Sequence, residues 1–110
     1  MSPSDKPLRW LHGEIKSPPF SRAARTEVGS CLRALQRGYR LAMPQSRPMP
    51  ILGPRCHELR VVDADLTWRV FYRIDSQAIL IAAVFAKKTE ATPVAIIEAC
   101  KRRFREYDNA

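Results

Sequence analysis

The sequence predicts a single α+β domain, and three observations lead to that fold class. An amphipathic helical pattern comes first, three strand-like runs joined by short turns follow, and a second helical pattern ends the chain. A length of 110 residues suits one domain, residues 1–110, with one compact core. We expect disorder to be confined to the ends of the chain, including a flexible N-terminus at residues 1–5, and to a proline-rich loop at residues 43–56.

The N-terminal third contains a short strand candidate and then the first helix. Residues 6–15 carry a few apolar side chains before a glycine, and they fit an edge strand. One apolar helical stripe follows at spacings i, i+3, i+4 and i+7: Val28, Cys31, Leu32 and Leu35. Ser21 can cap the start of this helix and Gly38 can end it. Gly29 weakens the interior, and a break there would leave two shorter helices.

Four prolines then interrupt the chain at positions 44, 48, 50 and 54. Proline lacks an amide hydrogen and has a fixed φ angle, so helix is excluded there and a long strand is improbable. We therefore expect residues 43–56 to form a loop that leads to the sheet.

The next part of the chain predicts a meander of three strands, at residues 57–62, 68–74 and 78–86. The second strand alternates, with Trp68, Val70, Tyr72 and Ile74 on one face and Arg69, Phe71 and Arg73 on the other. The third run is apolar on both faces, which is typical of a central strand. Because the connecting turns are short, we expect antiparallel neighbours.

The final element is predicted to be a helix. Thr92 can be the N-cap, with Pro93 at the first helical position. The expected inner stripe runs along Val94, Ile97, Cys100 or Lys101, and Phe104. Basic side chains crowd the last turns, where they suit the helix dipole.

Charge is the most informative part of the composition. Nineteen Lys and Arg against eleven Asp and Glu give a formal net charge of +8. This excess favours a polyanionic partner such as nucleic acid, an acidic protein or a membrane surface. No apolar run approaches the ~20 residues that cross a bilayer, and no secretory signal pattern opens the chain. We expect a cytoplasmic protein.

The cysteines and histidines do not suggest a metal site. Three cysteines, Cys31, Cys56 and Cys100, form neither a disulfide framework nor a CxxC motif, and the two histidines are far apart in the chain. We expect Cys31 and Cys100 to be small core residues. The prediction is therefore a protein without metal or another cofactor.

A set of basic residues is predicted to meet on one face of the meander. Arg60 lies on its first strand, Arg69 and Arg73 lie on its second, and Lys87 and Lys88 follow its third. Arginine binds phosphate bidentately, and Phe71 between the two arginines could stack on a base if its ring is exposed. The alternative interpretation is a solvated sheet face with ordinary surface charges.

Three segments together, "HELR", "WRVFYR" and "FAKKT", resemble the phage-derived toxins of the RelE/ParE superfamily, close to the HigB-like branch. The resemblance covers roughly residues 44–107. It implies a RelE-like fold, in which N-terminal helices pack on a small twisted antiparallel sheet that is followed by a C-terminal helix. It also implies a type II toxin that is neutralised in a hetero-oligomer by a cognate antitoxin, often a helix-turn-helix protein.

The typical activity of these toxins is metal-independent cleavage of mRNA on the ribosome. By that resemblance, Arg69 matches the arginine at the scissile phosphate, while Arg60 and Lys88, with Lys87 beside it, match basic positions that stabilise charge or transfer protons. His57 is a candidate base. Two departures stand out: "TEATPVAI" lacks the tyrosine of some relatives, leaving only Tyr107 late in the chain, and Glu58 stands where some relatives have a basic residue.

Three functions therefore remain open. The first is a ribosome-dependent mRNA endonuclease, and the second is a DNA gyrase inhibitor like the ParE branch. The third is a catalytically inactive basic module that binds RNA or only an antitoxin. Superfamily membership alone does not choose among them.

Overall fold

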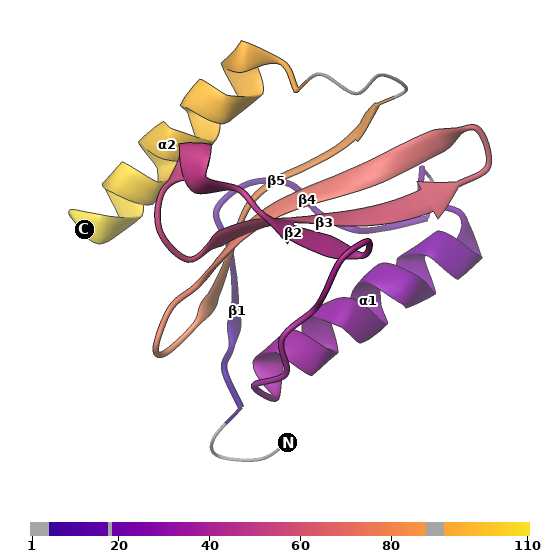
Figure 1. Cartoon of the computed structure of the whole chain (residues 1–110), viewed down its shortest axis with the longest axis horizontal. Coiled ribbons are helices and arrows are strands. Elements are labelled where there is room, and N and C mark those ends of the chain that lie inside the picture. The colour runs from indigo at the N-terminus through magenta and orange to yellow at the C-terminus, as the bar shows by residue number, and fades with distance from the viewer. Residues whose placement is uncertain (1–4, 18, 88–91) are drawn as a thin grey trace.

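The computed structural model describes residues 5–17, 19–87 and 92–110 of the chain. The elements follow in the order β1 (Leu8–Trp10), α1 (Arg22–Gln36), β2 (Ser46–Pro48), the 3-10 helix η1 (Pro50–Leu52), β3 (Cys56–Asp63), β4 (Leu66–Ile74), β5 (Ile79–Lys87) and α2 (Val94–Asp108). The sheet has the strand order β1-β5-β4-β3-β2. The two helices lie on opposite sides of it (Figure 1). The predicted α+β class is confirmed.

Helix α1 forms as its sequence predicts. The hydroxyl of Ser21 accepts a hydrogen bond of 3.0 Å from the amide of Ala24, which caps the first turn. The four residues of the predicted stripe are all buried. Gly29 faces open space and does not break the helix. Gly38 ends it with a φ of +93°, a conformation that glycine adopts without strain.

The meander of β3, β4 and β5 is antiparallel, as predicted. Strand β3 is one residue longer at each end than expected, β4 starts two residues earlier, and β5 is shifted by one residue toward the C-terminus. Trp68, Val70 and Tyr72 of β4 pack in the core under α1, whereas Phe71 packs in a second core under α2. The residues from Ile79 to Ala83 of β5 are buried on both faces, and β5 is an interior strand between β1 and β4. A bulge at Ala82 shifts its register against β4, since Phe71 pairs with Ala83 and Tyr72 with Ile81.

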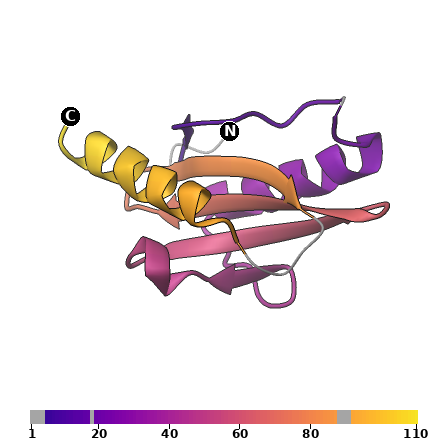
Figure 2. The same ribbon diagram turned by 90° about the horizontal axis from the view of Figure 1, so that it is seen from above.

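The sheet is larger than the predicted meander because each of its sides gains a short strand. Strand β1 occupies one edge, as expected, on the side of the sheet opposite β2 (Figure 2). It runs parallel to β5, so the sheet is mixed. Strand β2 lies within the proline-rich segment and pairs with β3. The exclusion of helix from that segment was wrong, because Pro50 opens the single turn of η1, where no amide hydrogen is required.

Helix α2 starts one residue later than expected. Pro93 occupies the N-cap position and none of the described side chains caps the helix, so Thr92 is not its cap. Cys100 and Phe104 are buried as predicted. Val94 is exposed, which corrects the expected stripe. Six residues span about one and two-thirds turns, so Val94 lies roughly 120° around the helix from Cys100.

Candidate nucleic-acid interface

Arg60 and Arg69 lie side by side on the face of the sheet that α2 partly covers. They are direct partners in the register of β3 and β4. Their neighbours along the strands, Leu59 and Val70, point into the core under α1, so alternation directs the two arginines to the other face. The main chain of Lys87 pairs with Thr67 at this same end of the sheet. The side chain of Lys87 and the whole of Lys88 lie outside the described residues.

A buried carboxylate organises these arginines. One oxygen of Glu58, Oε2, accepts a hydrogen bond of 3.0 Å from Arg69. The other, Oε1, accepts one of 2.8 Å from Nε of Arg47 and lies 3.9 Å from Nε of Arg60. Glu58 is 0% exposed and Arg69 3% exposed, whereas Arg60 and Arg47 are 31% and 37% exposed. We name these four residues the arginine cluster.

The arginine cluster carries a net positive charge. Three guanidinium groups surround one carboxylate, which leaves an excess of two positive charges. The Nε of Arg69 is buried and has no hydrogen-bond partner among the residues that the structure describes. Arg47 and Arg60 are open enough to reach an anion while Glu58 holds their stems in place. The arrangement can therefore bind a phosphate group, since guanidinium donors match phosphate oxygens.

The sequence did not predict Arg47 as a site residue, because Arg47 lies in the proline-rich segment that was expected to be a loop. Its position follows from the pairing of β2 with β3, which sets Arg47 opposite Glu58. That pairing joins residues eleven positions apart through an irregular connection. The sequence signal was Glu58 itself, because a carboxylate on a buried strand requires a cationic partner.

Two residues that were expected to bind RNA are instead buried in contacts within the protein. Phe71 is fully buried, so the condition for base stacking, an exposed ring, is not met: Phe71 packs in the core that contains Ala83 and Phe104. Arg73 is also buried, and its guanidinium donates to Asp75 and Asp108 at 2.6 to 3.0 Å. It also lies over the ring of Phe104. Arg73 thus fastens the end of α2 to the sheet.

His57 and Tyr107 lie away from the arginine cluster. His57 stacks on Tyr72, which belongs to the core under α1, so the imidazole lies on the other face of the sheet. Burial, together with Arg40, lowers the pKa of His57. Tyr107 precedes Asp108, which binds Arg73, and Arg73 lies about 13 Å along β4 from Arg69. The end of α2 does not fold over the cluster.

The ion pair between Arg73 and Asp108 gives a pH-dependent prediction. Hydrogen bonds from Arg73 lower the pKa of Asp108, so its folded value lies below the unfolded value of about 3.9. This stabilisation is present above the unfolded pKa and is lost as pH falls through the folded pKa. We expect Asp108→Asn to lower the urea midpoint at pH 6, with the difference from wild type shrinking toward pH 2.

The matched control is Glu106→Gln, which alters an exposed pair with Arg102 on the same helix. It should leave the midpoint nearly unchanged at every pH. A difference for Asp108→Asn that stays constant from pH 6 to pH 2 would contradict the assigned ion pair.

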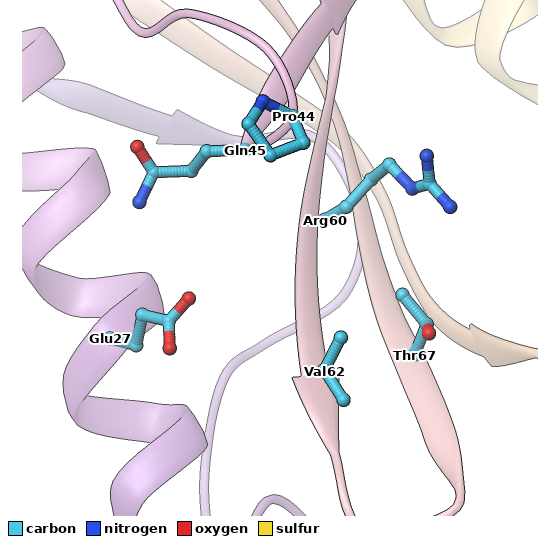
Figure 3. A pocket seen from close by; sticks show the side chains of 6 residues that line it. All are labelled: Glu27, Pro44, Gln45, Arg60, Val62 and Thr67. Carbon is cyan, nitrogen blue, oxygen red and sulfur yellow. The ribbon is translucent and has the colours of Figure 1, made fainter.

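A pocket opens beside the arginine cluster, along the edge of β3 where β2 ends. Its volume is about 370 Å³ and it is lined by Glu27, Pro44, Gln45, Arg60, Val62 and Thr67. Glu27 of α1 and Arg60 of β3 stand on opposite sides of it, and the guanidinium of Arg60 points away from Glu27 (Figure 3). A hydrogen bond of 2.9 Å from the Arg60 amide to the Gln45 carbonyl marks the end of strand pairing.

The described residues offer little to a metal ion. Among them, no group of three or more His, Cys, Asp or Glu side chains is placed to hold one. All three cysteines are buried, which confirms Cys31 and Cys100 as core residues. Burial raises the pKa of Cys56 and Cys100 to about 11. In the same part of the chain, no helix combines the length and apolar character needed to cross a membrane.

Fold and site together define a class: a small basic α+β domain with an arginine cluster suited to phosphate on one sheet face. Comparison with known families places it more closely. The model of the family "Phage derived protein Gp49-like (DUF891)" matches residues 18–105, and the chain belongs to this family of toxins related to the RelE and HigB types. No curated protein and no solved structure gives a significant match.

Proposed function

We propose that this chain is the toxin of a type II toxin–antitoxin system, of the HigB-like branch, and that it cleaves mRNA on the ribosome. The observation that carries the proposal is the arginine cluster: three guanidinium groups around one buried carboxylate, in a member of a toxin family. The excess charge fits a polyanionic substrate. The protein would act in the cytoplasm and be held inactive by a cognate antitoxin.

The proposed reaction uses the ribose 2′-OH as nucleophile. Its oxygen attacks the adjacent phosphorus, the bond to the 5′ oxygen breaks, and a 2′,3′-cyclic phosphate and a free 5′-OH result. Arg60 and Arg47, which are partly exposed, would stabilise the negative charge that builds up on the phosphate oxygens. The buried Arg69 would add positive charge from within the sheet face, since Glu58 fixes its guanidinium and its Nε has no partner among the described residues.

Glu58 is assigned a positioning role. Both of its oxygens are engaged by arginines and the side chain has no exposed surface. A general base must come within hydrogen-bond reach of the 2′-OH, which this carboxylate does not offer. Proton transfer is therefore assigned to Lys87 and Lys88, since neighbouring cations lower a lysine pKa.

The test is induced expression in cells that lack the antitoxin, with growth followed and mRNA 5′ ends mapped. We expect growth arrest with new cuts inside translated codons, and neither with Arg60→Ala. The matched control, Arg105→Ala, removes an exposed arginine on α2 far from the cluster and should behave as wild type. Arrest without cuts but with DNA damage would instead indicate a gyrase inhibitor. No arrest would indicate a module that only binds RNA or antitoxin.

A further inference from the structure

A row of arginines runs along the outer face of α1, and a glycine interrupts it. One ridge of the helix surface takes every fourth residue, ending at the C-cap: Arg25, Gly29, Arg33 and Arg37. Gly29 adds no side chain to this ridge, and no described atom lies within 4 Å of the place that its Cβ would take. The ridge therefore has a notch near the middle of the helix.

Two cavities meet at this notch, one on each flank of α1. Gly29 and Arg33 line both of them. The first, of about 300 Å³, extends toward β1 and reaches Trp10. The second, of about 390 Å³, extends toward the segment after the helix and reaches Tyr39. Since the two cavities share the residues of the notch, they form one groove across α1, which we name the α1 groove.

An exposed aromatic ring stands in each half of the α1 groove. Trp10 is 43% exposed and Tyr39 is 67% exposed. Within the described part of the chain, no other Phe, Tyr or Trp is as exposed as these two. An exposed ring offers a flat face on which a nucleobase can stack, and such stacking tolerates any base.

The cations of the α1 groove suit phosphate groups. Asp5 lies 2.7 Å from Arg33 and offsets its charge. Arg25 and Arg37 are exposed and form no ion pair with a described residue. Twelve residues separate them, which is about 18 Å along the helix axis. Both are arginines, whose guanidinium groups bind phosphate through two hydrogen bonds and also stack on rings. Cations interleaved with stacking rings are typical of single-stranded nucleic-acid sites.

The fold itself does not require glycine at position 29. Glycine weakens a helix interior relative to alanine. Gly29 does not have a positive φ, and a methyl group at its Cα would meet open space. A ligand that crosses the helix does require the notch, because any larger side chain would fill it.

We propose that the α1 groove is a second nucleic-acid site, which binds a single strand across the outer face of α1. Bases would stack on Trp10 and Tyr39, while phosphates would bind Arg25 and Arg37. Helix α1 lies on the side of the sheet opposite α2 (Figure 1), whereas the arginine cluster lies on the α2 side. The α1 groove is thus separate from the proposed cleavage site, and the inference goes beyond the proposed function.

The test is a fluorescence titration of the full chain with a 2′-O-methyl-uridine hexamer, which has no free 2′-OH and therefore resists cleavage by the proposed mechanism. The other tryptophan, Trp68, is buried, so stacking should quench Trp10 selectively. We expect saturable quenching that is lost in Trp10→Phe. Arg37→Ala should weaken binding and reduce the slope of log affinity against log salt by about 1. No quenching by the hexamer would overturn the proposal.

Gly29→Gln tests the notch. It favours helix over glycine and its Cβ meets no neighbour, so the chain should fold, but its side chain should occupy the groove. We expect affinity for the hexamer to fall about tenfold. The matched control, Ala23→Gln, adds the same side chain at an exposed position of α1 outside the groove and should bind as wild type does. Equal affinities for Gly29→Gln and wild type would overturn the proposal.

Tyr39→Ala should weaken binding about tenfold, whereas Tyr39→Phe keeps the ring and should bind as wild type does. Equal losses in both Tyr39 variants would refute the stacking.

Two further titrations separate this site from its alternatives. Arg60→Ala should leave the quenching of Trp10 unchanged, because Arg60 lies on the other side of the sheet; loss of quenching in that variant would place the binding at the arginine cluster and overturn the proposal. Vesicles of phosphatidylglycerol should quench Trp10 less than the hexamer does. Quenching by the vesicles alone would indicate a membrane surface instead. The hexamer is neither cut nor bound to a ribosome, so these results do not depend on whether the chain is a nuclease.

Discussion

Glu58→Ala is expected to lower the free energy of unfolding by about 3 to 5 kcal/mol, the usual cost of leaving one half of a buried ion pair alone. The substitution leaves Arg69 without its carboxylate, and this side chain is 3% exposed and has one nitrogen with no partner in the described part of the chain. It also removes the hydrogen-bond acceptor of Arg47, so β2 loses a side-chain hydrogen bond to β3. Urea denaturation followed by circular dichroism measures the change.

The double substitution Glu58→Leu with Arg69→Leu distinguishes a lost ion pair from lost packing. It removes both charges together and leaves apolar groups in a buried place, so we expect it to be more stable than either single leucine variant. Glu98→Ala is the control for removal of a carboxylate, since its pair with Lys101 is exposed, and it should change stability by less than about 0.5 kcal/mol. Additive losses in the double variant would show that Glu58 and Arg69 do not depend on each other.

Arg60→Ala is expected to lower the rate of mRNA cleavage by about 10²- to 10³-fold, the usual effect of deleting one group that stabilises transition-state charge. Arg60 is 31% exposed and its nitrogen is 3.9 Å from Glu58, so the ion pair contributes little to stability. Cleavage should therefore fall while the urea midpoint stays within experimental error of wild type. The assay is a time course of mRNA cleavage on programmed ribosomes.

Arg60→Lys separates charge from geometry. Lysine keeps the positive charge but cannot donate two parallel hydrogen bonds, so we expect only partial recovery of the rate. Arg105→Ala, which removes an exposed arginine from the last turns of α2, should cleave as wild type does. A full rate in Arg60→Ala would remove Arg60 from the site, and an equal loss in Arg105→Ala would indicate a general effect of charge.

The parts of the fold that the sequence predicted correctly are those set by the spacing of apolar residues within a single helix or strand. The stripe from Val28 to Leu35 and the alternation along β4 each lie within one element, so each pattern is complete in a short window. The parallel pairing of β1 with β5 joins residues about 70 positions apart, and nothing in the local pattern of Leu8–Trp10 specifies it. The exposure of Val94 has a different cause, since Val94 lies roughly 120° around α2 from the buried Cys100.

The candidate site was predicted correctly where strand geometry determines it, and incorrectly where contacts between distant elements determine it. Alternation and register brought Arg60 and Arg69 together, because both follow from strand geometry alone. The burial of Phe71 depends on where α2 lies, and the capture of Arg73 depends on Asp108 at the far end of the chain. Arg47 comes to the site from β2, so its proximity to Glu58 depends on tertiary structure.

Incubation of the purified chain with an mRNA, once free and once bound in ribosomes, tests the central claim most directly, with analysis of the ends of any product. The proposed mechanism predicts cuts only in ribosome-bound mRNA, with a 2′,3′-cyclic phosphate upstream and a 5′-OH downstream, and a loss of those cuts in Arg60→Ala. Intact mRNA on ribosomes, or products that carry a 5′-phosphate, would contradict it.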